Sequence, residues 1–178
     1  VFSVAKMYPD GLQGHFDWNG QACKDQPLQL NDRTIAVAGS VPVSWTWREL
    51  HHFQVIGTGP SITYTHPVSG TMPYPVALRL TVQSDLGCKD SVAKDILIYE
   101  SVTADAGPDK VLPFGQSYQF NGNSSTGPNL TYTWSPAMGL NDPFIMHPTV
   151  SGDRDNQYIL TVANEVGCMD KDTVSIRF

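Results

Sequence analysis

Cysteine and histidine are the residue types in this chain best suited to bind a transition metal, and cysteine can also form a disulfide. The three cysteines are Cys23, Cys88 and Cys168, and none belongs to a CxxC pair of the kind that zinc sites use. His51 and His52 are adjacent, so on a regular strand they would face opposite sides, and we find no acidic or cysteine partner at a ligand spacing. The sequence therefore predicts no metal site and no cofactor.

Catalytic signatures are the next group of residues to consider. No GxSxG elbow occurs, and the GTG at 57–59 is followed by proline and not by the lysine of a phosphate-binding loop. Acidic residues pair weakly at Asp105 and Asp109, and again at Asp153 and Asp155. Neither pair stands in a DxDxDG-like string, so we interpret them as solvated turn carboxylates. The sequence predicts that the protein is not an enzyme.

The composition restricts the partners. A net charge of -6 and a pI near 5.1 argue against nucleic acid, which needs clustered Lys and Arg. No stretch approaches the roughly 18 consecutive apolar residues of a membrane span. The opening, VFSVAKMYPDG, indicates a piece of a longer chain. We therefore expect other domains of the same polypeptide among the partners, with a surface protein or a polysaccharide as further candidates.

A repeated phrase indicates how the 178 residues are organised. Residues 80–90 read LTVQSDLGCKD and residues 160–170 read LTVANEVGCMD. In each copy the phrase predicts the end of one strand, a turn and the start of the next strand, because β-branched and apolar residues alternate on both sides of a polar, glycine-containing segment. Gly87 and Gly167 supply the positive φ that such hairpin loops require.

Two further segments match between the halves. PLQLND (27–32) corresponds to SYQFNG (117–122), and VSWTW (43–47) corresponds to TYTW (131–134). Short strands separated by turn signals every 8–12 residues or so are typical of an immunoglobulin-like sandwich. The sequence thus predicts an all-β protein with two tandem immunoglobulin-like β-sandwich domains.

The tryptophans have two predicted roles. Trp47 and Trp134 lie on corresponding central strands, and each is predicted to fill the space between two sheets. Trp18, Trp45 and Tyr64 are the candidates for stacking on a sugar, and packing in the core is the alternative for them. Trp45 stands two residues before Trp47, so both would share one face of a regular strand.

Both halves resemble the PKD-like immunoglobulin-fold repeats that occur in tandem on secreted and cell-surface proteins of gliding-type Gram-negative bacteria. The second half carries the resemblance in ADAGPDKVLPFGQSYQFNG, YTWSPAMGLNDPFIMHPTV and YILTVANEVGCMD; the first carries it in HFDWNGQACKDQPLQLND, SWTW, YTHPVSG and YPVALRLTVQSDLGCKD. The chain departs from the family where PKD domains have WDFGDG after the Trp strand. The predicted organisation is a lead-in segment (1–14), a first PKD-like sandwich (15–100) and a second (101–178).

The resemblance implies a cellular location and a type of module, and it implies no catalytic activity. It implies a non-catalytic adhesion or spacer module of a larger exported protein, located outside the cell or on its surface. The alternative is a carbohydrate-binding accessory module of a secreted hydrolase, which would need exposed aromatic residues.

An exported protein permits a disulfide. Cys23 precedes the early strand of the first domain and Cys88 opens its last strand. If these elements are neighbours at one edge of the sandwich, a Cys23–Cys88 bridge would close a loop of about 65 residues and leave Cys168 free.

Overall fold

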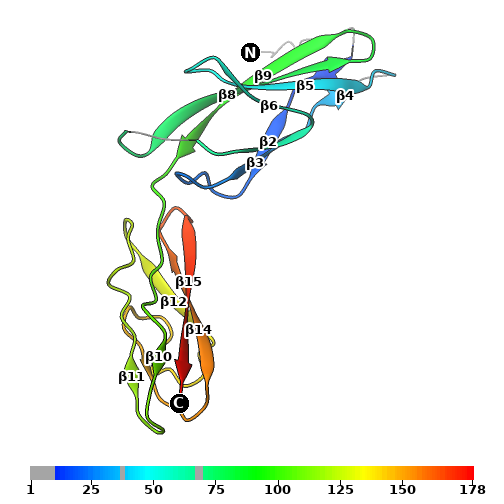
Figure 1. Cartoon of the computed structure of the whole chain (residues 1–178). Coiled ribbons are helices and arrows are strands. Elements are labelled where there is room, and N and C mark those ends of the chain that lie inside the picture. Colours follow the sequence, from blue (N-terminus) through cyan, green and yellow to red (C-terminus); the bar gives the residue numbers. More distant parts are fainter. Residues whose placement is uncertain (1–10, 37–38, 67–69) are drawn as a thin grey trace, which may run out of the picture. The chain divides into compact units, whose positions relative to one another are not determined.

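The chain is built from strands. The computed structural model describes residues 11–36, 39–66 and 70–178, and within these ranges the regular elements are all strands (Figure 1). The chain consists of two compact units, which divide between Tyr99 and Glu100. Each unit has its own hydrophobic core. The prediction of an all-β fold with two tandem sandwiches is confirmed.

The first unit contains two main sheets. Its strands are β1 (Leu12–Gln13), β2 (Phe16–Asn19), β3 (Leu28–Asp32), β4 (Ile35–Ala36), β5 (Pro42–Glu49), β6 (Gln54–Thr58), β7 (Ser61–Tyr64), β8 (Tyr74–Ser84) and β9 (Lys89–Ile98). One sheet has the order β6-β5-β8-β9, the other has the order β2-β3-β7, and β1 pairs with β4. The strand pairs are antiparallel. This is the two-sheet arrangement of an immunoglobulin-like sandwich.

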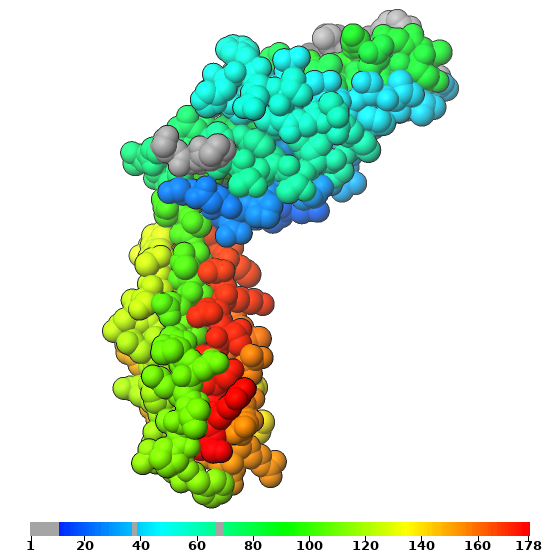
Figure 2. All heavy atoms as spheres, viewed as in Figure 1, coloured from blue at the N-terminus to red at the C-terminus, as the bar shows by residue number. Residues whose placement is uncertain are grey.

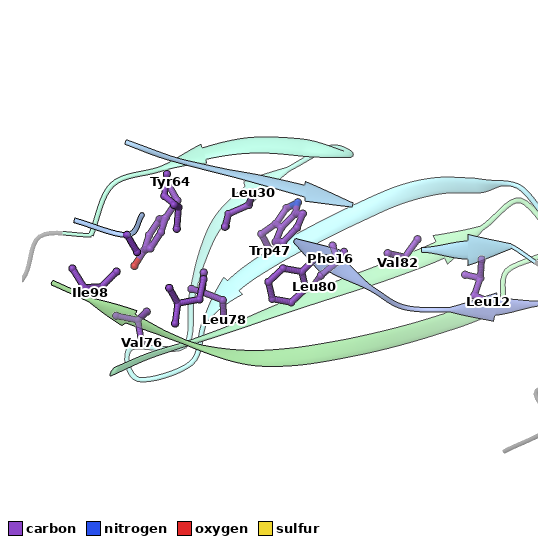
Figure 3. Packing of buried hydrophobic residues seen from close by; sticks show 13 residues of the cluster. Leu12, Phe16, Leu30, Trp47, Tyr64, Val76, Leu78, Leu80, Val82 and Ile98 are labelled. Atoms are coloured by element: carbon purple, nitrogen blue, oxygen red, sulfur yellow. The ribbon is translucent and has the colours of Figure 1, made fainter. Parts of the chain in front are cut away.

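The core of the first unit follows the two-residue period of its strands. Along β8, Val76, Leu78, Leu80 and Val82 are all buried, and the residues between them face outward. Figure 3 shows Trp47 and Phe16 side by side within this core, and their ring centroids are 5.2 Å apart in an edge-on arrangement. The inner faces of the sheets therefore meet as one packed layer.

The first unit begins earlier than residue 15, where the sequence placed the domain boundary. Leu12 on β1 is only 3% exposed and belongs to the hydrophobic core. β1 is held by pairing with β4. Residues 11–14 are thus part of the sandwich and not of a lead-in segment, while residues 1–10 lie outside the described residues.

The second unit repeats the plan with shorter strands. These are β10 (Lys110–Val111), β11 (Tyr118–Gln119), β12 (Thr131–Ser135), β13 (Thr149–Val150), β14 (Asn156–Ala163) and β15 (Met169–Arg177). One sheet has the order β10-β15-β14-β12, and β11 pairs with β13. β10 runs parallel to β15, and the space-filling view shows this green segment beside the red C-terminal strand (Figure 2).

The two closing hairpins turn in the same way. Ser84 N–H donates to the Cys88 carbonyl at 2.9 Å, and Asn164 N–H donates to the Cys168 carbonyl at 3.0 Å. Gly87 has φ +82° and Gly167 has φ +91°. The prediction that the repeated phrase encodes a strand, a glycine turn and a second strand is confirmed, because β8–β9 and β14–β15 pair antiparallel across these turns.

Candidate functional site

A cavity of about 440 Å³ lies in the first unit, beside the turn that joins β5 to β6. It is lined by Glu49, His52, residues 54–56 and residues 63–66. β5 supplies the carboxylate, β6 supplies one wall, and the end of β7 supplies the opposite wall. The cavity thus gathers titratable groups that are up to 17 positions apart in the sequence.

Glu49 is the charged group at the centre of this cluster. It is only 3% exposed, because it follows Trp47 by two residues on β5 and shares its inward face. Its Oε1 accepts the backbone N–H of His51 at 2.7 Å, and its Oε2 accepts the backbone N–H of His52 at 3.1 Å. The carboxylate therefore fixes the backbone of the β5–β6 turn.

The two imidazoles of the turn also approach this carboxylate. His52 Nδ1 lies 2.6 Å from Glu49 Oε2, and His51 Nδ1 lies 3.3 Å from Oε1. Burial alone would raise the pKa of Glu49, but hydrogen bonds from the His52 ring and from the two backbone N–H groups outweigh it, so the pKa is lowered. Glu49 is thus a stable carboxylate whose oxygens are already engaged.

The expected geometry of His51 and His52 was wrong. Both residues lie in a turn and not on a regular strand, so their side chains are not forced to opposite faces. Glu49 is the acidic partner of both imidazoles. Within the described ranges, no group of three or more His, Cys, Asp or Glu side chains is arranged to hold a metal ion.

An aromatic stack forms another side of the site. Tyr64 OH lies 2.6 Å from His66 Nδ1, and the His66 ring stacks on Tyr74 with centroids 5.8 Å apart. Burial raises the pKa of the Tyr64 phenol and lowers the pKa of His66. Tyr64 therefore stays protonated and donates, while His66 is favoured as the neutral acceptor. The sequence did not predict this cluster: His66 lies two residues after Tyr64, but Tyr74 belongs to β8 of the other sheet and reaches His66 only because the two sheets pack face to face.

The three residues predicted to contact a glycan do not form an exposed platform. Tyr64 is 8% exposed and lies in the core of the first unit, near Val76 and Ile98 (Figure 3). Trp18 and Trp45 are partly buried and pack against the same core. Trp45 Nε1 also donates to Asp32 Oδ2 at 2.7 Å. For Tyr64 the glycan prediction is wrong, because its ring is covered by the sandwich.

The two central tryptophans fill the cores. Trp47 is 0% exposed and its Nε1 donates to the Gly59 carbonyl at 2.9 Å. Trp134 is 1% exposed, stacks on Phe120 at 4.7 Å, and donates to the Ile145 carbonyl at 3.1 Å. Each indole thus buries its apolar body while its N–H keeps a partner.

The predicted Cys23–Cys88 disulfide is wrong. Cys23 and Cys168 are the disulfide-bonded cysteines, and Cys88 carries a free thiol. The backbone of Cys23 pairs with that of Tyr99 in an isolated parallel β-bridge, and Tyr99 follows the last residue of β9. Cys88, in contrast, precedes the first residue of β9. Eleven residues of extended chain span roughly 36 Å, far beyond the Cα separation of about 4.4–6.8 Å that a disulfide tolerates.

Solved structures of β-sandwich modules are similar to this chain. The PKD1 domain of the Vibrio cholerae metalloprotease PrtV shares 17% identity, covering 48% of this chain and 94% of that one, with a TM-score of 0.39. The PKD1 domain of Vibrio anguillarum Epp shares 12% identity over 51% of this chain and 96% of that one, at 0.42. A structure of carbohydrate-binding modules from the β-sandwich superfamily shares 13% identity over 87% and 56%, at 0.45.

With identities of 12–17% and TM-scores below 0.5, these similarities to solved structures do not identify a function. No protein-family model matches the chain, and no curated protein matches it. Among the described residues, no helix has the length and apolar character needed to cross a membrane.

Proposed function

We propose that this chain is a non-catalytic, extracellular adhesion and spacer module of a larger exported surface protein. The observation that carries the proposal is that each unit closes its own hydrophobic core around a fully buried tryptophan. Two separately packed sandwiches in tandem suit a chain that holds other domains of the same polypeptide at a distance. Such modules resist deformation because their interiors are close-packed.

Two further observations support an extracellular location and a non-catalytic role. Cys23 and Cys168 are disulfide-bonded, and disulfides persist in oxidising compartments such as the cell exterior. Glu49, the buried carboxylate of the cavity, already accepts two backbone N–H groups and lies against two imidazoles. Its role is to hold a turn, and its lowered pKa makes it a weak base.

Glycan binding by aromatic stacking is the less favoured alternative. It needs exposed rings, whereas Tyr64 is buried and both Trp18 and Trp45 pack against the core. We therefore expect that substitution of Trp18 by alanine lowers the stability of the first unit. We do not expect it to change the affinity for a neutral glycan.

Single-molecule force spectroscopy tests the spacer role. The fragment is stretched between handles with reductant present, so that the disulfide-bonded cysteines do not limit extension. We expect two separate unfolding events with contour-length gains of roughly 250–350 Å, from about 3.3–3.6 Å per residue. A single event, or extension without resistance, would contradict two independently packed spacer modules.

A further inference from the structure

The outward face of the sheet β6-β5-β8-β9 carries two arginines directly opposite one another. Arg48 on β5 pairs in register with Arg79 on β8, and both are exposed. The residues that alternate with them, Trp47 and Leu80, are fully buried, so both arginine side chains project outward. Like charges at directly opposite positions of two strands repel each other and destabilise the pair.

Neither guanidinium is compensated by a carboxylate. Within the described ranges, no ion pair or side-chain hydrogen bond involves Arg48 or Arg79. Asp95 on β9 lies one row away, opposite Ala77, and makes no ion pair with Arg79. In contrast, Arg33 elsewhere in this unit pairs with Asp17 at 2.8 Å. The two facing arginines are thus an uncompensated positive site in a chain of net charge -6.

On one side of the arginines, the neighbouring rows of the sheet carry hydrogen-bonding groups, while Ala77 and Asp95 form the row on the other side. Thr46, Thr81 and Ser91 form the adjacent row across β5, β8 and β9. Ser44, Gln83 and Lys89 form the row beyond it. These residues occupy the same outward face, since positions two apart on a strand point the same way. The face therefore offers hydroxyl and amide groups and a further cation beside the arginines.

We propose that Arg48 and Arg79 form a binding site for an oxyanion, a carboxylate or a sulfate, carried by an extended acidic polysaccharide. A guanidinium presents a planar fork of N–H donors that matches both anions. The hydroxyl row is placed to hydrogen-bond the hydroxyls of the same sugar chain. A bound anion offsets the repulsion between the two arginines. Relief of this repulsion therefore adds to the free energy of binding.

An acidic protein partner fits this face less well. A stable protein interface buries about 800 Å² on each side and relies on large apolar or aromatic anchors near its centre. Here the rows on one side of the arginines present hydroxyl and amide groups, and Ala93, opposite Arg79, adds only a methyl group. Val55, opposite Arg48 on β6, is 45% exposed and supplies a small apolar surface against which a sugar ring can pack. A polysaccharide therefore fits this face better than a protein does.

This inference rests on the proposed adhesion role and names its ligand class. Binding of the intact fragment is measured by calorimetry at low ionic strength against polygalacturonate, dextran sulfate and neutral dextran. We expect binding to at least one acidic polymer, none to dextran, and weakening with added salt because the charges are exposed. Preference for polygalacturonate assigns a carboxylate ligand, and preference for dextran sulfate assigns a sulfate ester.

Arginine variants locate the binding. Arg48→Ala and Arg79→Ala should each weaken affinity about tenfold, and the double variant about a hundredfold, since each removes a charge-assisted contact. Arg79→Lys should be intermediate, because it keeps the charge and loses the fork. Arg154→Ala, an exposed arginine of the second unit, should bind like the parent chain. Circular dichroism and the melting temperature verify that every variant is folded.

Three results would overturn the proposal. These are absence of binding to both acidic polymers, equal weakening by Arg154→Ala, and tighter binding to poly-glutamate, which would indicate an acidic peptide as the ligand. Two unfolding events in the force experiment combined with any of these results would reject the oxyanion site and leave the spacer role standing.

Discussion

Asp90 and Asp170 stand 80 residues apart, and each carboxylate binds the first segment of its own unit. Asp90 Oδ2 accepts the backbone N–H of Gly14 at 2.7 Å, and Asp170 Oδ2 accepts the backbone N–H of Ala104 at 2.9 Å. Both aspartates follow the glycine turn of the repeated phrase. The aspartate that ends the phrase thus ties the final strand of each sandwich to the opening segment of the same unit.

Replacing Asp170 by alanine should destabilise the second unit by about 1.5–3 kcal/mol, the range for hydrogen bonds to charged groups. The partly buried N–H of Ala104 would lose its acceptor. Hydrogen exchange measured over residues 100–178 reports this change. Lys171→Ala is the matched control, because Lys171 is the next residue, is exposed and faces outward. Equal protection in the two variants would show that the hydrogen bond contributes nothing.

Glu49 should make the stability of the first unit depend on acidity. Its pKa is lowered in the folded state, so its contribution is complete above its ordinary value of 4.5 and is lost as the pH falls through the folded value. Glu49→Gln should be less stable at pH 7 by about 1–3 kcal/mol and should vary less below pH 4.5. Urea denaturation at several pH values tests this. Parallel pH profiles for the variant and the parent would contradict it.

His66 should contribute a separate loss of stability at mildly acidic pH. Burial lowers its pKa below 6.5, so the unfolded chain takes up a proton before the folded chain does, and stability falls as the pH drops below about 6.5. His66→Gln, which retains an acceptor for Tyr64, should flatten the profile between pH 7 and the lowered pKa. His147→Gln, in the second unit, serves as the histidine control. The prediction fails if both glutamine variants have the same profile.

The cysteines should differ in their reaction with an alkylating reagent. In denaturant without reductant, Cys88 should be the position labelled, because Cys23 and Cys168 are disulfide-bonded. After reduction all three should be labelled. Mass spectrometry of the digested protein gives the positions. Labelling of Cys168 with Cys23 and Cys88 unlabelled before reduction would restore the bridge that the sequence suggested.

The sequence by itself determined the local features of this protein. The alternation in residues 76–82 and 157–162 became β8 and β14, and the glycine turns after them formed as expected. Trp47 and Trp134 were placed in the cores for the same reason: a strand buries every second side chain. These features depend on neighbours within a few residues, so the order of residue types specifies them.

Tertiary structure decided which distant residues meet. The exclusion of Cys88 as the disulfide partner of Cys23 depended on the length of β9, because a ten-residue strand carries its two ends far apart. The position of Glu49 beside His51 and His52 required a turn in place of a continued strand. The facing of Arg48 and Arg79 required one particular register of β5 on β8, since a shift of β5 by one residue would turn Arg48 inward and leave it no longer opposite Arg79. Strand register and strand length depend on how the side chains of the whole core pack together. A short stretch of sequence therefore does not specify them.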